Sequence, residues 1–184
     1  MWRGASAPPA FRRAECQATL SCEQTCAGGW PKTTVRTSMV DLYRLPADTP
    51  AFQQLSAVKD PIARAEGLEQ AIAADLGDER LFPYIQVHEF EALLLAEPER
   101  LGCLPGRGEA VRRLVAAVGE YDSPEHIDGG EETHPCARIV QCVPGYSKVV
   151  DGPQLAALTG LERLRNSCRH FGAWLTRLED LGAE

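Results

Sequence analysis

Three ionisable residues that follow a short apolar run are the strongest candidates for chemistry in this sequence. The run reads LFPYIQV at positions 81–87, and His88, Glu89 and Glu91 come directly after it. Ligands of open α/β sheets bind at the carboxyl ends of strands, so ionisable groups placed there are better candidates than scattered surface charges. An extended chain would put Glu89 and Glu91 on one face, whereas a helix would put His88 beside Glu91. Either geometry brings two ionisable groups together.

A fourth candidate, Asp41, interrupts the apolar segment TSMVDLY at 37–43. An unpaired charge is costly to bury, so Asp41 must be paired, metal-bound or at the exposed end of a strand. Carboxylates that face one another across neighbouring parallel strands would form an oxygen site suited to Mg²⁺ or Mn²⁺. Two structural alternatives stay open. Asp41 could cap the following turn or pair with Arg44, and the acids after residue 87 could begin a helix, where the helix dipole favours them.

The elements that must position these residues are a strand, a helix and a second strand. The segment TSMVDLY predicts a strand at 37–43, and LFPYIQV predicts another at 81–87. Between them, Asp60 and Pro61 predict the start of a helix and Gly77 its end. The predicted buried stripe of this helix is Ala65, Leu68, Ile72 and Leu76. Since a helical crossover joins parallel strands, we predict an α/β fold with a small parallel sheet.

After the second strand the chain is predicted to be mostly helical. Helices are expected at 89–96, 109–121, 136–142, 153–158, 161–165 and 167–181. Residues 1–33, with Pro8, Pro9, Gly28 and Gly29, are predicted to be a poorly ordered segment. The rest, 34–181, is predicted to be a single domain with a helical C-terminal half.

The composition restricts the class of protein. The chain has 184 residues, of which 44% are hydrophobic and 24% are charged, which is typical of one globular domain. Its net charge of -7 and pI near 5.2 argue against an extensive basic surface, so any contact with nucleic acid must be local or metal-mediated. No apolar run is long enough to span a bilayer, and residues 1–10 lack the apolar core of a secretory signal. We therefore predict a cytoplasmic protein.

Cysteines and glycine-rich segments exclude some further classes. The seven cysteines have no repeating spacing and predict free thiols, although Cys22 and Cys26 leave half of a zinc site as an alternative. A P-loop, a dinucleotide fingerprint and a nucleophile elbow are all missing from the sequence, which disfavours ATP binding.

Four segments resemble the bacterial family known as domain of unknown function 4276. They read TSMVDLYRLP (37–46), PYIQVHEFEALLLAEPERL (83–101), SPEHIDGGEETHPCARI (123–139) and GLERLRNSCRHFGAWLTRLE (160–179). The resemblance covers about residues 34–181, and HEFEALL is its most specific part. Members of this family are similar to TOPRIM-type, Rossmann-like domains, in which acidic residues hold Mg²⁺ in nucleases, primases and topoisomerases.

The resemblance implies a nuclease-like domain that cleaves phosphodiester bonds with Mg²⁺ or Mn²⁺. Asp41, Glu89 and Glu91 would be the catalytic metal ligands, and His88 would support them. Two basic residues, Arg138 and Lys148, would contact the phosphate of the nucleic acid if they face the acids. The alternative is a non-catalytic module that binds a partner protein, such as an ATPase, in a defence or mobile-element system.

Two departures from the family pattern predict that any activity is impaired. Family members usually begin with a strand that ends in a VEGxTE-like motif, whose glutamate is the expected general base or metal ligand, and residues 1–33 hold no such motif. Relatives typically read PSKR where this chain reads PCAR at 135–138, so a serine and a lysine are replaced. We therefore expect a truncated or wrongly started member of the family.

Overall fold

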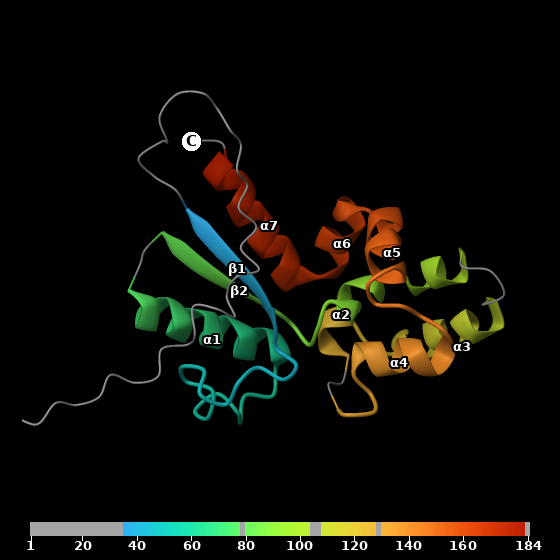
Figure 1. Cartoon of the computed structure of the whole chain (residues 1–184), viewed down its shortest axis with the longest axis horizontal. Coiled ribbons are helices and arrows are strands. Elements are labelled where there is room, and N and C mark those ends of the chain that lie inside the picture. Colours follow the sequence, from blue (N-terminus) through green and yellow to red (C-terminus); the bar gives the residue numbers. More distant parts are fainter. Residues whose placement is uncertain (1–34, 78–79, 104–107, 128–129, 183–184) are drawn as a thin grey trace, which may run out of the picture.

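Two parallel strands lead into a helical half in the computed structural model (Figure 1). The structure describes residues 35–77, 80–103, 108–127 and 130–182. The predicted segment 1–33, with Cys22 and Cys26, lies outside these residues. The predicted α/β class, with a small parallel sheet and a mostly helical C-terminal half, is confirmed.

The sheet consists of β1 (Arg36–Asp41) and β2 (Leu81–Gln86) in the described part of the chain. The strands pair in parallel from Arg36 opposite Leu81 to Asp41 opposite Gln86. Backbone pairing continues past the strand ends, because Leu42 N–H donates to Gln86 at 2.9 Å and Tyr43 N–H donates to His88 at 2.6 Å. Asp41 is therefore held alongside the segment that leaves β2.

Helix α1 (Pro61–Leu76) makes the crossover between the strands, with the predicted bounds. Asp60 caps it, since its carboxylate accepts a hydrogen bond from Ile62 N–H at 3.1 Å, and Pro61 occupies the first turn, where no amide partner is needed. Gly77 ends the helix in the left-handed conformation at φ 61°. The predicted buried stripe was wrong at its last position: Leu76 is 39% exposed, because the final turn extends beyond the part of the helix that is buried.

The remaining helices follow β2 in the predicted order. Their bounds are α2 (Glu91–Leu94), α3 (Gly108–Val118), α4 (Pro135–Cys142), α5 (Asp151–Thr159), α6 (Leu161–Ser167) and α7 (Arg169–Gly182), with 3₁₀ turns η1 (Pro98–Cys103) and η2 (Pro124–His126). Helix α2 is shorter than the predicted 89–96, so Glu89 precedes it.

The sheet lies between two helices, with a separate core in the helical half. On one face, α1 packs Leu68 and Ile72 against Ile85 and Val87. On the other face, α7 brings Phe171 and Trp174 to Tyr84, and Figure 1 shows the two helices on either side of the strands. A third cluster joins α2 to α5 through residues such as Leu94, Leu114, Ile139 and Leu155. These buried aliphatic side chains each contribute roughly 1.5–3 kcal/mol to folding.

Two carboxylates, one buried and one partly buried, attach α7 to the rest of the molecule. Glu125, 0% exposed, accepts hydrogen bonds from the backbone N–H groups of His170 and Phe171, both at 3.0 Å, at the start of α7. Glu69 on α1 accepts from Ile85 N–H at 2.7 Å and from the His170 ring at 2.9 Å. Although burial opposes it, the hydrogen bond to Glu69 raises the pKa of His170. These acids stabilise the packing of the helices on the sheet.

Candidate metal centre

The ends of β1 and β2 bring Asp41 to the segment 88–91. Asp41 lies at the last position of β1. His88 turns the chain out of β2 with φ 62°, a left-handed conformation that is uncommon outside glycine. This turn directs the chain from the sheet into the helical half, so the acids that follow lie between the two.

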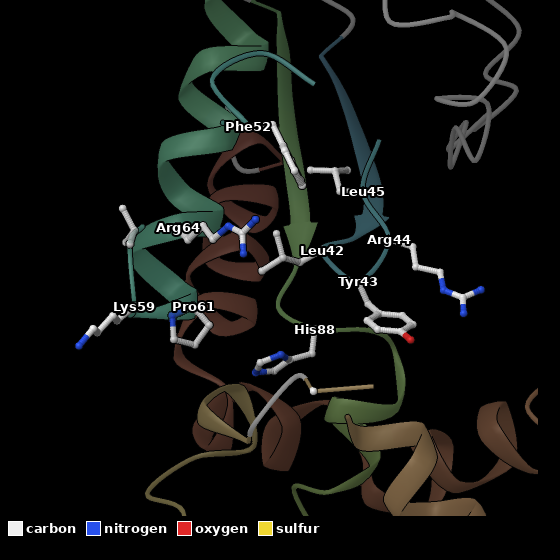
Figure 2. A pocket seen from close by; sticks show the side chains of 11 residues that line it. Leu42, Tyr43, Arg44, Leu45, Phe52, Lys59, Pro61, Arg64 and His88 are labelled. Atoms are coloured by element: carbon white, nitrogen blue, oxygen red, sulfur yellow. The ribbon is translucent and has the colours of Figure 1, made fainter. Parts of the chain in front are cut away.

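The side chain of His88 makes a different contact from the one predicted for it. Its Nε2 lies 3.1 Å from the carbonyl oxygen of Glu125, and Figure 2 shows its ring between Pro61 and Tyr43. The ring lines a cavity beside the acidic residues. A different histidine, His134, contacts the acidic cluster.

Glu89 is buried and holds several groups at once. Its Oε1 accepts hydrogen bonds from Cys136 N–H at 2.7 Å and from the His134 ring at 2.6 Å. Since a carboxylate only accepts, Nδ1 of His134 is the donor, and it cannot also accept from Ala137 N–H, which approaches it at 3.5 Å. Burial works against the charge of Glu89, yet these hydrogen bonds and Lys148 lower its pKa. Glu89 is therefore an ionised group that attaches the start of α4 to the site.

Glu91 has weaker partners than Glu89. Its side chain is 3% exposed, Lys148 Nζ lies 3.3 Å from Oε2, and the Tyr146 hydroxyl donates to Oε1 at 3.4 Å. Lys148 also donates to Glu89 Oε2 at 3.1 Å, so one ammonium bridges both acids. Although its partial burial opposes the shift, the hydrogen bond to Glu89 and the charge of Glu91 raise the pKa of Lys148. The Lys148 side chain is 53% exposed, so this ammonium can leave for solvent.

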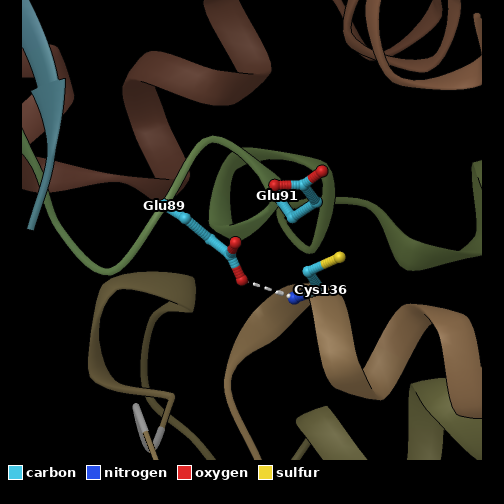
Figure 3. A group of neighbouring side chains, drawn as sticks. All are labelled: Glu89, Glu91 and Cys136. Carbon is cyan, nitrogen blue, oxygen red and sulfur yellow. Dashed lines mark hydrogen bonds between the residues drawn. The ribbon is translucent and has the colours of Figure 1, made fainter. Parts of the chain in front are cut away.

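Cys136 completes a group of donors suited to a metal ion. Donor atoms of Glu89, Glu91 and Cys136 all lie within 4.8 Å of one another, and Figure 3 shows the three side chains gathered between α2 and the start of α4. Burial and the charge of Glu91 raise the pKa of the Cys136 thiol. Two carboxylates and a sulfur fit a divalent ion, and the sulfur makes the site softer than the predicted all-oxygen site. The buried Glu-Glu-Cys group can therefore hold a metal ion.

Asp41 is coupled to this group although it lies outside the set that shares the 4.8 Å distance. Asp41 is exposed by surface area. Its carboxyl group is nonetheless partly desolvated. This desolvation, with smaller contributions from the charges of Glu89 and Glu91, raises its pKa to about 6. The shift shows that three carboxylates interact at this edge of the sheet.

The two predicted phosphate contacts lie in different places. Lys148 reaches the acids, as described above. Arg138 instead donates to the carbonyl oxygen of Thr133 at 2.6 Å and to the Tyr121 hydroxyl at 3.0 Å, and its guanidinium lies over the Tyr121 ring. No described contact of Arg138 reaches the acidic cluster, because its side chain extends toward Tyr121, which follows α3.

Three residues of the centre were not predicted from the sequence as part of it: His134, Cys136 and Tyr146. The available signal was the start of α4, where His134 and Pro135 precede Cys136 and mark a helix N-terminus. A buried carboxylate is favoured at such a terminus, but the sequence does not say that Glu89 supplies it.

Comparison with known proteins assigns the chain to a family. The model of the family described as a domain of unknown function, DUF4276, matches residues 2–179 of the chain. The match includes residues before position 34, where the resemblance described above begins. No curated protein and no solved structure matches the chain. Separately, none of the helices in the described residues is both long and apolar enough to cross a membrane.

Proposed function

The chain belongs to the DUF4276 family, and we propose that its acidic centre binds a divalent metal ion and supports hydrolysis of phosphodiester bonds in nucleic acid. The observation that carries this proposal is the excess of negative charge at one place. Asp41, Glu89 and Glu91 interact with one another, and one ammonium, that of Lys148, lies among them. Such a group attracts a second cation. The implied similarity to TOPRIM-type domains agrees with this assignment.

Glu91 and Glu89 would hold the ion, together with Cys136, whose thiol would release its proton to solvent when the ion binds. Glu91 is the main ligand in this proposal, because its hydrogen bonds are longer and fewer than those of Glu89. A divalent ion would polarise a phosphate oxygen and lower the pKa of water. Sulfur is a poor ligand for Mg²⁺, so we expect Mn²⁺ to bind more tightly than Mg²⁺.

Asp41 and Lys148 would act on the substrate itself. A carboxyl group with a pKa near 6 can accept a proton from an attacking water at neutral pH. Lys148, whose side chain is 53% exposed, would leave the carboxylates when the ion binds and contact the phosphate. Tyr146 would orient Glu91 through its hydroxyl group. We leave Arg138 out of the proposed site because of its contacts with Tyr121 and Thr133.

Two measurements test the proposal. Calorimetry should detect one Mn²⁺ per chain, and labelled single- and double-stranded DNA and RNA should be cleaved with Mn²⁺ and not with EDTA. The variants Asp41→Ala and Glu91→Gln should lose this cleavage, whereas Asp48→Ala, at an exposed aspartate, should keep it. Cleavage that persists in Asp41→Ala, or no detectable Mn²⁺, would contradict the proposal.

A second candidate function is a non-catalytic module for a partner protein, such as the ATPase considered above. Two observations favour it: Lys148 already forms ion pairs with Glu89 and Glu91, and the next two residues, Val149 and Val150, are 85% and 56% exposed. Exposed apolar residues that are adjacent in the sequence are typical of protein contact surfaces. A pull-down with the Val149→Ser, Val150→Ser variant as control distinguishes this function: a partner lost in the variant, without Mn²⁺ binding by the protein, favours the module.

A further inference from the structure

A cavity of about 480 Å³ lies at the end of the sheet, next to the acidic centre. Leu42, Tyr43 and Arg44 from the chain after β1 line one side, and Lys59, Pro61 and Arg64 at the start of α1 line the other. Figure 2 shows the guanidinium of Arg64 reaching toward Leu42, while Lys59 and Arg44 point outward at opposite ends. Its volume is within the range of small-ligand sites.

The charge of the cavity is opposite to that of the whole protein. The chain has 26 acidic and 19 basic residues, yet the described residues that line the cavity include Arg44, Lys59 and Arg64 and no carboxylate. Asp41, Asp60 and Glu89 are each adjacent in sequence to a lining residue but do not line the cavity, and the carboxylate of Asp60 caps α1. The acidic composition argued against an extensive basic surface, but it did not exclude a local basic site of this kind.

Arg64 is the central cation of this cavity. Its side chain is half-buried over the ring of Phe52, with the guanidinium carbon 5.3 Å from the ring centroid. Its Nε is buried without a hydrogen-bond partner, and no carboxylate among the described residues forms an ion pair with it. Nε is shielded from solvent, whereas an anionic ligand that reaches the terminal nitrogens of the Arg64 guanidinium would gain a charge-assisted hydrogen bond.

The cavity and the acidic centre share a wall. The Tyr43 ring, which lines the cavity, stacks on the His134 ring with 4.5 Å between centroids, and His134 donates to Glu89. In addition, Tyr43 and His88 line the cavity, and they lie close in sequence to Asp41 and Glu89. The basic cavity therefore lies directly beside the acidic centre.

We infer that the cavity between Arg64 and Tyr43 binds a phosphate group of single-stranded nucleic acid, one or more nucleotides away from the bond at the acidic centre. This inference rests on the proposed function for the choice of ligand. A single strand fits better than a duplex, because Arg44, Lys59 and Arg64 gather around one open cavity and do not form an extended basic surface for two backbones.

The test measures binding without metal, so that it is independent of cleavage. Fluorescence anisotropy of a labelled 12-nucleotide single strand is followed in EDTA at several salt concentrations. Arg64→Met should weaken binding about tenfold and reduce the salt slope by about 1, and Arg64→Lys should keep most of the affinity. Arg113→Met removes an exposed arginine of α3 that does not line the cavity, and it should bind like the unaltered protein.

Further experiments identify the ligand and control for misfolding of the variants. Inorganic phosphate or a nucleoside monophosphate that displaces the strand at millimolar concentration locates the contact at a phosphate, whereas a duplex that binds as tightly as the strand would overturn the choice of ligand. Thermal melting checks the Arg64 variant, and if it does not fold, the surface variant Lys59→Gln with Arg44→Gln replaces it, with a similar expected loss.

The outcomes separate this inference from the proposed function. Arg64-dependent binding without any cleavage in Mn²⁺ supports the cavity and contradicts the nuclease. Cleavage together with binding that Arg64→Met leaves unchanged supports the nuclease and overturns the cavity. No binding of the strand by the unaltered protein also overturns it.

Discussion

Glu125 and Glu91 are both buried carboxylates, yet their surroundings differ in kind. Glu125 accepts from two backbone N–H groups at the start of α7, both at 3.0 Å. Glu91 has the Tyr146 hydroxyl at 3.4 Å and the ammonium of Lys148 at 3.3 Å. Backbone donors stay in place as long as the helix is folded, whereas a lysine whose side chain is 53% exposed can exchange with another cation. Burial of a carboxylate alone therefore does not identify a metal site. A partner that can exchange with a metal ion does.

Glu89 is intermediate between these two acids. One of its oxygens accepts from Cys136 N–H and His134, as a structural acid would, and the other accepts from Lys148. The acidic centre is thus attached to the fold through Glu89 and open to a cation at Glu91. Variants at Glu125, Glu91, Lys148 and Asp41 can break this comparison or make it quantitative.

The largest effect is expected on stability at Glu125. Glu125→Ala should lower the free energy of unfolding by about 3 kcal/mol, because it removes two hydrogen bonds to a charged acceptor and leaves two buried amides without partners. Urea unfolding followed by circular dichroism measures this. Glu91→Ala is the matched variant, and the comparison fails if it costs as much as Glu125→Ala.

The next effect is on metal affinity at Glu91. Glu91→Gln should weaken Mn²⁺ binding at least about 100-fold, which corresponds to about 2.7 kcal/mol, since it replaces a charged ligand by a neutral one of the same shape. Its stability should change by less than about 1 kcal/mol. Calorimetry and urea unfolding of the same sample give both values. A large loss of stability with unchanged Mn²⁺ affinity would make Glu91 a structural acid like Glu125.

A smaller effect of opposite sign is expected at Lys148. Lys148→Met should strengthen Mn²⁺ binding about tenfold, because it removes the cation that competes for Glu89 and Glu91. Cleavage should nevertheless fall, since the proposed phosphate contact is lost. Arg113→Met controls for the change in net charge. Weaker Mn²⁺ binding in Lys148→Met would show that the ammonium supports the metal site instead of occupying it.

The smallest effect concerns pH. The pKa of Asp41 is about 6 in the folded protein and roughly 3.9 in an unfolded chain, so between these values the folded state holds a proton that the unfolded state has released. The stability that Asp41 contributes is therefore present below about pH 4 and is lost as the pH rises to about 6. Solvent reduces the effect to less than about 1 kcal/mol, since Asp41 is exposed.

The free energy of unfolding of Asp41→Asn at pH 4, 5, 6 and 7 measures the contribution of Asp41 to stability, with Asp48→Asn as control. Asp41→Asn should flatten the decline in stability between about pH 4 and pH 6. NMR titration should also place the pKa of Asp41 lower in Glu91→Gln than in the unaltered protein, because one of the charges that raise it is gone. An unchanged titration would mean that the acids are too far apart to share an ion.

The strands and helices could be predicted because local sequence sets them. Asp60, Pro61 and Gly77 mark both ends of α1 by backbone chemistry that needs no other part of the chain. Leu76 has the spacing of a buried residue and is nonetheless exposed, because burial depends on where the covering layer ends.

The site could be predicted in its β-strand half, and Lys148 was predicted to join it only on the condition that it faced the acids. Asp41, Glu89 and Glu91 follow from the parallel strands, which bring strand ends together. Lys148, His134 and Cys136 come from helices and turns that follow β2, and their approach depends on how α4 packs against α2. His88 was predicted to support the acids, but the left-handed turn at this residue directs its ring into the neighbouring cavity. Neither sequence spacing nor composition determines such packing.

The order of the site residues along the chain also sets when the site can form during synthesis. Asp41, Glu89 and Glu91 leave the ribosome first, while Lys148 and the backbone amides of His170 and Phe171 that bind Glu125 come later. A nascent chain thus carries the acids of the centre before their partners exist. The complete centre can therefore assemble only after the chain has been synthesised beyond Lys148.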